Sequence, residues 1–165
     1  MPGRGLLVAP ADGLVHGKSA AGTDEFLGIP YAPPPVGALR WQPPQPAARW
    51  RGVRQATAFA PHCPQPPSDF GVASTSENCL YLNVYAPAHA ASLRGLPVMV
   101  WVHGGSLLVG ESDDCNPAAL VRRGVGRPRA APVDRHRAGQ RPVQPQVETD
   151  FSAEHHCGFW SLAEG

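Results

Sequence analysis

The chain has 165 residues, of which 20 prolines and 18 glycines make up about 23%, against about 12% in an average globular protein. Much of the backbone must therefore be turn or loop. The formal net charge is only +1 and 16% of the residues are charged, so nothing general draws the chain to nucleic acid or to an anionic membrane surface. No apolar run approaches the about 18 residues of a membrane span, so we expect none.

The amino-terminal segment and the cysteines do not decide the compartment. The apolar run before Pro10 is shorter than the core of about 7 to 15 residues that a signal peptide needs. We therefore expect no signal peptide, which favours a cytoplasmic over a secreted location. The cysteines (Cys63, Cys79, Cys115 and Cys157) are too few and too irregularly spaced for a disulfide framework or a paired C-x-x-C zinc site.

The first predicted element is a β-hairpin. Its strands are Leu6–Ala9 and Leu14–Lys18, separated by a Pro-Ala-Asp-Gly turn whose Pro fixes φ and whose Gly tolerates positive φ. Glu25–Tyr31 is predicted to be extended and to end at a run of prolines that cannot donate to a sheet. The segment that follows is expected to be irregular as far as residue 67, with Trp41 and Trp50 anchoring it to the core.

Two later strands differ in their pattern. Leu80–Tyr85 alternates aliphatic residues with Tyr and Asn, which is typical of a strand with unlike faces. Pro97–His103 is apolar on both faces, as expected of a strand between two helix layers. It runs directly into Gly104 and Gly105, and open α/β sheets place ligand sites at such carboxyl ends of strands.

The pattern changes after Val125. Gly126–Pro145 is rich in Arg and Pro without apolar periodicity, so we predict disorder there. Its arginines could contact nucleic acid as an arm, but non-specific adhesion is the better interpretation because aromatic residues are not interleaved with them. His155, His156 and Cys157 suggest a metal site or a catalytic base. Adjacent histidines point to different sides of a helix or strand, which favours an exposed tail instead.

Three segments together resemble the type-B carboxylesterase family, the cholinesterase-like branch of the α/β-hydrolases. They are FLGIPYAPPPVGALRWQPPQP (Phe26–Pro46), SENCLYLNVYAP (Ser76–Pro87) and LPVMVWVHGGSLLVGES (Leu96–Ser112). The resemblance implies an α/β fold. We expect the amino-terminal part of an α/β-hydrolase, with antiparallel hairpin strands and the first strands of the central sheet, and we expect it to be incomplete.

The resemblance also assigns roles to individual residues. It implies that the backbone N–H groups of Gly105 and Ser106 form an oxyanion hole, with Gly104 shaping the turn; the alternative is an ordinary turn at the end of a strand. Oxyanion donors stabilise the charge that develops on a tetrahedral intermediate. The resemblance further implies a disulfide between Cys63 and Cys79 in an oxidising compartment.

Within the same resemblance, Glu77 corresponds to a structural residue of a buried ion pair. Arg40 and Arg49 are its candidate partners here, and an exposed, solvated Glu77 is the alternative. No metal or cofactor is implied, and the expected ligands are small-molecule carboxylic esters rather than nucleic acid.

The catalytic triad of this family has no counterpart in the chain. Acyl transfer on this fold needs a Ser on a G-x-S-x-G turn, followed by an acid and a His, and no G-x-S-x-G occurs in the sequence. Gly110-Glu111-Ser112 begins like that turn, but Asp114 stands where the second Gly is needed. Ser112 is therefore not expected to be a nucleophile, and Gly17-Lys18-Ser19 fails in the same way.

We therefore expect residues 1–124 to be the amino-terminal portion of a carboxylesterase type-B domain, and residues 125–165 to be an irregular or disordered tail. A shifted reading frame is our hypothesis for the tail. The expected function is that of a serine carboxylesterase, truncated and inactive by itself. The alternatives are a non-catalytic cholinesterase-like binding module and a fragment that complements a second chain.

Overall fold

The computed structural model describes residues 6–69, 71–90, 96–123 and 160–161. The predicted tail of residues 125–165, including His155, His156 and Cys157, thus lies almost entirely outside the described residues. The described elements, in chain order, are β1 (Leu6–Val8), β2 (Leu14–Ala20), β3 (Thr23–Pro30), the 3-10 helix η1 (Gly37–Leu39), β4 (Val53–Gln55), β5 (Tyr81–Pro87), β6 (Met99–Val100), α1 (Ala118–Arg122) and β7 (Trp160–Ser161).

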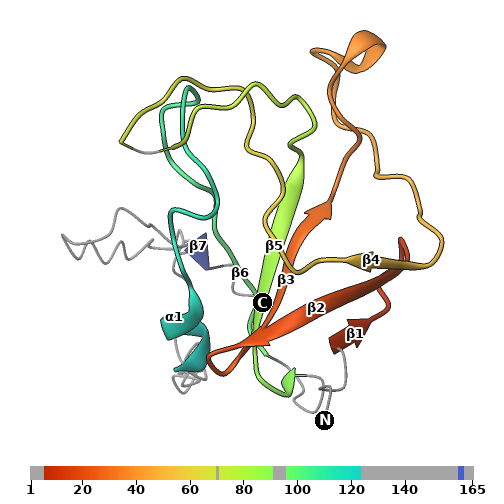
Figure 1. The fold of residues 1–165 in the computed structure, drawn as a ribbon, viewed down its shortest axis with the longest axis vertical. Coiled ribbons are helices and arrows are strands. Elements are labelled where there is room, and N and C mark those ends of the chain that lie inside the picture. The colour runs from red at the N-terminus through yellow and green to blue at the C-terminus, as the bar shows by residue number, and fades with distance from the viewer. Residues whose placement is uncertain (1–5, 70, 91–95, 124–159, 162–165) are drawn as a thin grey trace, which may run out of the picture.

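Most of the strands form one sheet (Figure 1). β1 and β2 are antiparallel, with Leu7 opposite His16, which confirms the predicted hairpin. β3 lies antiparallel to the second half of β2, and β5 lies antiparallel to β3. β4 adds a parallel strand beside the first half of β2. β4 was not predicted, because three residues are too short to show a period.

The core of this sheet lies between β2, β3 and β4. Val15, Phe26 and Ala56 are buried there. Gly17 on β2 allows the Phe26 ring to approach, since a Cβ at Gly17 would lie 2.7 Å from that ring and 2.4 Å from the Glu25 carbonyl oxygen. The bare glycine backbone thus sets the spacing between β2 and β3.

The two tryptophans expected to anchor the irregular segment differ. Trp50 packs against the core, and its indole Nε1 donates to the Leu14 carbonyl oxygen at 2.9 Å. Trp41 is 92% exposed, so its predicted anchoring is wrong. It lies just after η1 at a positive φ of 61°, and this turn directs the chain away from the sheet.

The predictions for the two later strands, β5 and β6, have different outcomes. β5 confirms the predicted alternation, with Leu82 and Val84 more exposed than Asn83 and Tyr85. The prediction that Pro97–His103 is buried on both faces is wrong, because β6 has two residues and Val98 is 71% exposed. In the described part of the chain β6 pairs only with β7. The α-helix described there, α1, contacts β5 and β3.

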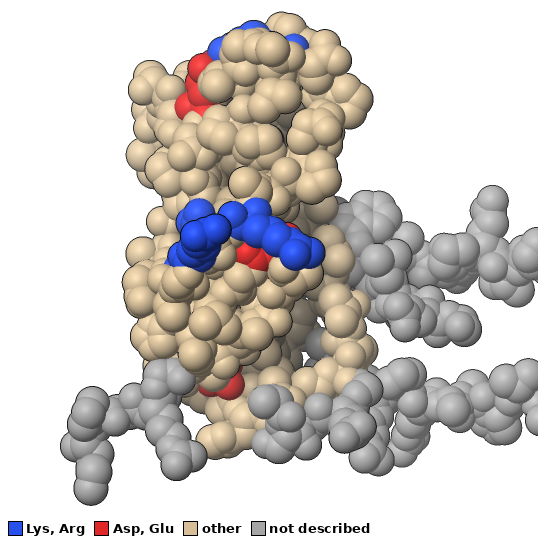
Figure 2. Space-filling model, turned by 90° about the vertical axis from the view of Figure 1, so that its right-hand side faces the viewer, with Lys and Arg blue, Asp and Glu red and all other residues tan. Residues whose placement is uncertain are grey.

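Charged side chains occupy a small part of the surface. On the face shown in Figure 2, Lys and Arg gather near the middle beside acidic groups, while most of the surface is uncharged. Among the described residues, no helix is long and apolar enough to cross a membrane.

Candidate functional site

The glycine turn after β6 has a backbone that few residues adopt. Gly105 has a φ of 109°, and Ser106 and Leu107 have φ values of 56° and 62°. Two successive non-glycine residues at positive φ are uncommon, and each costs of order 1 kcal/mol or more. Gly110 closes the segment with a φ of 120°. The backbone of residues 105–110, which we call the glycine loop, is therefore held in a strained conformation.

Internal hydrogen bonds of the glycine loop leave its first three amides without an acceptor. The Gly105 carbonyl oxygen accepts from the amides of Leu108 at 3.0 Å and Val109 at 3.1 Å. In the described part of the chain, the amides of Gly105, Ser106 and Leu107 donate no hydrogen bond. Ser106 is exposed and Gly105 half-buried, so both N–H groups remain free to bind an acceptor.

The steric demand for glycine lies at Gly105 rather than at Gly104. A Cβ at Gly105 would lie 1.6 Å from the Val109 carbonyl oxygen, whereas a Cβ at Gly104 would meet nothing within 4 Å. Gly104 was expected to shape the turn, but that role falls to Gly105. A Cβ at Gly110 would lie 2.5 Å from the Gly104 carbonyl oxygen and 2.6 Å from His103 Nδ1, so this residue too must lack a side chain.

Gln65 holds the far end of the glycine loop. Its Oε1 accepts from the Gly110 amide at 2.7 Å, and its Nε2 donates to the Val72 carbonyl oxygen at 3.0 Å and to Glu111 Oε2 at 3.3 Å. Gln65 lies between Cys63 and Cys79, which form the predicted disulfide, with a Cα–Cα distance of 4.9 Å. The segment closed by the disulfide is thus bonded to the glycine loop.

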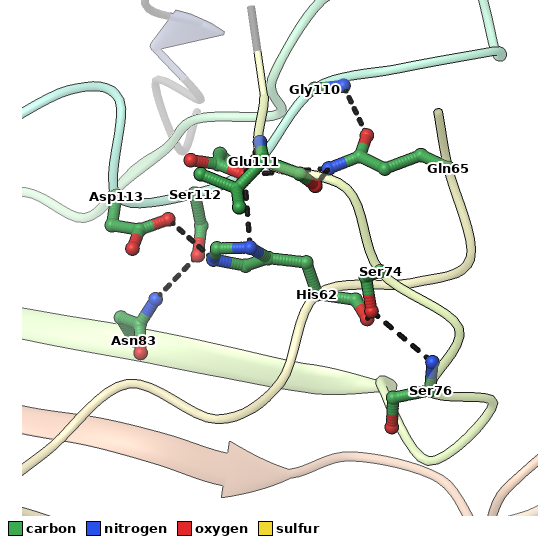
Figure 3. Close-up of polar contacts among 10 residues, drawn as sticks. His62, Gln65, Ser74, Ser76, Asn83, Gly110, Glu111, Ser112 and Asp113 are labelled. Atoms are coloured by element: carbon green, nitrogen blue, oxygen red, sulfur yellow. Dashed lines mark hydrogen bonds and ion pairs between the residues drawn. The ribbon is translucent and has the colours of Figure 1, made fainter. Parts of the chain in front are cut away.

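His62 lies between two carboxylates of the next segment (Figure 3). Its Nδ1 is 2.9 Å from Glu111 Oε2, and its Nε2 is 2.8 Å from Asp113 Oδ1. The Glu111 side chain is 7% exposed, and its Oε2 also accepts from the Val72 amide at 2.8 Å. These contacts fix residues 111–113 directly after the glycine loop.

Ser112 does not contact a base in this network. Asn83 on β5 donates from Nδ2 to Ser112 Oγ at 2.8 Å, and its Oδ1 accepts from the Gly28 amide at 2.8 Å. The register of β3 against β5 shifts between Phe26 and Ile29, and Asn83 connects this irregularity to the segment after the glycine loop. Ser19 lies in β2, where its hydroxyl donates to Asp24 at 2.8 Å.

Burial and neighbouring charge shift two pKa values near the network. Burial, with Glu25 and Asp113 nearby, raises the pKa of Tyr85 to about 12. Burial and the carboxylates of Glu111 and Asp113 raise the pKa of Asp114 against the smaller opposing effect of His62. A cavity of about 240 Å³ lies between Tyr85, Asp113 and the β2–β3 side of the sheet. The carboxylates of Glu111, Asp113 and Asp114 thus lie close together directly after the glycine loop.

The predicted ion pair of Glu77 forms with Arg40. The two side chains are 40% and 46% exposed, so the pair lies at the surface rather than buried. Arg49 is not its partner.

Sequence reasoning did not single out His62, Gln65, Asn83 or Asp113. Their contacts with one another and with residues 110–112 connect positions 29 to 51 residues apart in the chain. No motif in one sequence joins such distant positions. The one available signal was Asn83, a polar residue on the less exposed face of the alternating β5 pattern.

Comparisons with known proteins agree on the region that contains this site. A family model described as "Carboxylesterase family" matches residues 6–125. Cocaine esterase of Oryctolagus cuniculus is 45% identical over 124 residues, which is 66% of this chain and 23% of that protein. Acylcarnitine hydrolase of Mus musculus is 47% identical over 110 residues, which is 59% of this chain and 20% of that protein.

Solved structures give the same result. A PNB esterase aligns with a TM-score of 0.65 at 38% identity, over 71% of this chain and 25% of its own. A carboxylesterase of Geobacillus stearothermophilus aligns with a TM-score of 0.63 at 39% identity, over 72% of this chain and 24% of its own. The chain thus spans about a fifth to a quarter of the length of these proteins.

Proposed function

Because the chain belongs to the carboxylesterase family, we propose that its glycine loop supplies oxyanion donors for the hydrolysis of carboxylic esters. The donors are the backbone N–H groups of Gly105 and Ser106. The observation that carries this proposal is that, within the described residues, neither amide has an acceptor, while the amides of Leu108 and Val109 bond to the Gly105 carbonyl oxygen and fold the loop back on itself.

The chemistry of the loop supports this role. A tetrahedral intermediate places negative charge on the former carbonyl oxygen, and fixed N–H groups stabilise that charge without reorganisation at the moment of reaction. The open space beside Gly104 lets a substrate carbonyl approach the backbone. Gln65 holds the loop at Gly110, and His62 holds the residues that directly follow it.

The 165 residues contain no G-x-S-x-G, so the proposal does not include a nucleophile from them. In the family mechanism a serine attacks the ester carbonyl and the alcohol leaves, and water then hydrolyses the acyl-enzyme to the carboxylic acid and free serine. We propose that this chain contributes the oxyanion loop of such a reaction and does not hydrolyse esters by itself.

A loop exchange tests the proposal. Residues 103–110 replace the corresponding loop of the PNB esterase, and cleavage of a p-nitrophenyl ester is measured. The exchanged enzyme is expected to stay active. Gly105→Ala within it keeps its N–H but places a Cβ 1.6 Å from the Val109 carbonyl oxygen, so it should displace the donors and lower kcat by about 10²- to 10³-fold, the effect of losing one oxyanion donor. Ser106→Ala is the matched control, because residue 106 already has a Cβ and the change leaves the backbone in place. Equal activity of the two variants would contradict the proposed donors.

A second candidate function is that of a complementing chain, which joins a separate polypeptide to complete an esterase. It is favoured by apolar side chains left in solvent around β5 and β6, with Val102 67% and Leu108 74% exposed. Such a surface marks an interaction site. Co-expression with the part of the PNB esterase that follows the matched region should restore ester cleavage, and failure to associate with that part would exclude this candidate.

A further inference from the structure

The side-chain carboxamide of Gln65 joins the segment closed by the disulfide to the far end of the glycine loop (Figure 3). Its Oε1 accepts from the Gly110 amide at 2.7 Å. Its Nε2 donates to the Val72 carbonyl oxygen at 3.0 Å and to Glu111 Oε2 at 3.3 Å. A carboxamide has two N–H donors and one acceptor oxygen, so all of them are engaged. The orientation of this half-buried side chain is therefore defined by its partners.

The backbone that carries the carboxamide is fixed as well. The Gln65 amide donates to the Ser74 carbonyl oxygen at 3.0 Å, and the Ser74 amide donates back to Gln65 at the same distance. Gly71 lies against the side chain, since a Cβ there would be 2.8 Å from Gln65 Nε2 and 3.2 Å from both Cδ and Oε1. The group thus fits only while residue 71 lacks a side chain, and its own segment holds it in place.

Gly110 packs against the peptide unit that carries the first donor. A peptide unit is planar and trans, so its N–H points away from its C=O and turns whenever the carbonyl turns. The Gly105 N–H shares such a unit with the Gly104 carbonyl. A Cβ at Gly110 would lie 2.5 Å from that carbonyl oxygen, so the Gly110 backbone lies directly beside it. The position of Gly110 therefore limits the direction of the Gly105 N–H.

The second donor is also held from its carbonyl side. The Ser106 N–H shares a peptide unit with the Gly105 carbonyl, whose oxygen accepts from the amides of Leu108 and Val109. Both amides belong to residues that come just before Gly110. The positive φ values of 56° at Ser106 and 62° at residue 107 favour opening of the loop. A contact from outside the loop, such as the one from Gln65 to Gly110, opposes that opening.

From these contacts we propose that Gln65 is a positioning residue. By holding Gly110, it keeps the N–H groups of Gly105 and Ser106 directed at one acceptor position. This role rests on the proposed function, in which those two N–H groups are the oxyanion donors. Donors that are already oriented stabilise an oxyanion without reorganisation at the moment of reaction. Gln65 itself contacts no substrate and acts only through the loop.

Residual dipolar couplings measured by NMR on the full chain test this role, because they report the direction of each N–H bond relative to the sheet. Gln65→Met removes the hydrogen bonds of the carboxamide and keeps an unbranched side chain. The couplings of the Gly105 and Ser106 N–H bonds should fall toward zero, while those of β3 keep their values. Gln55→Met is the matched control, because Gln55 Oε1 also has a side-chain partner, His16 Nδ1 at 2.8 Å. It should leave the loop couplings unchanged.

Gly71→Ala keeps the test valid if Gln65→Met fails to fold. Its Cβ displaces the carboxamide without removing it, and the same loss of coupling is expected. Unchanged Gly105 and Ser106 couplings in both variants overturn the role, as does an equal loss in Gln55→Met. No ester takes part in these measurements, so they fail separately from the proposed function. Equal activity of Gly105→Ala and Ser106→Ala in the loop exchange would exclude the donors without changing any coupling.

Discussion

Replacing Gly105 with alanine tests whether the glycine loop has the backbone described above. The new Cβ would lie 1.6 Å from the Val109 carbonyl oxygen, at a φ of 109°. Keeping the loop closed would cost about 1 to 3 kcal/mol for the dihedral angle alone, before the clash is added. Opening the loop gives up two hydrogen bonds to the Gly105 carbonyl oxygen, worth about 1 kcal/mol each. Opening is the smaller cost, so we expect the loop to open.

The loss of about 2 kcal/mol corresponds to about 30-fold. Amide hydrogen exchange, resolved by residue, should therefore show the protection of Leu108 and Val109 falling by about that factor. Strand β3, which is distant from the loop in sequence, should keep its protection. Gly104→Ala is the control, because a Cβ there meets nothing within 4 Å, and it should change neither amide. Equal protection in the two variants would refute the described geometry.

Three further predictions concern the sheet and the disulfide. Replacing Cys63 and Cys79 by serine should lower the free energy of unfolding in urea by about 3 kcal/mol, the value expected for a loop of about this length; unchanged stability would contradict the disulfide. Gly17→Ala should lower Tm through a loss of about 1 to 3 kcal/mol, because its Cβ would lie 2.4 Å from the Glu25 carbonyl oxygen, and an unchanged Tm would contradict that packing. The pKa of Tyr85 is raised to about 12 from 10.0, so its neutral form is favoured in the folded chain and the free energy of unfolding should fall as pH rises from about 10 to 12. Urea unfolding at each pH measures this fall. A Tyr85→Phe chain should lack the part due to Tyr85, and an equal fall in both chains would contradict the raised pKa.

The sequence anticipated those parts of the fold that follow from local chemistry. The Pro-Ala-Asp-Gly turn and the apolar runs around it predicted the first hairpin, and alternation predicted β5. The fold class, part of an α/β-hydrolase, is confirmed by the 38–39% identical esterase structures. The Cys63–Cys79 pair came from the family resemblance, not from spacing.

Other features depend on contacts that one sequence does not encode locally. The apolar pattern of Pro97–His103 indicates what the strand can bury, but the described residues supply no helix layer to cover it, and Val98 remains exposed. The side chain of Trp41 is exposed because of the positive φ of the turn in which this residue lies. His62 and Asp113 are 51 positions apart in the sequence, so only the folded chain brings them together.

The proposed site consists of Gly104, Gly105 and Ser106. Its proposed role is to stabilise a negative charge that a nucleophile from another group must generate. Incubation of the purified chain with a fluorophosphonate, followed by intact-mass spectrometry, tests this directly. The account predicts an unmodified mass and no ester cleavage, since no serine here lies on a G-x-S-x-G turn. One adduct per chain on any serine would contradict it.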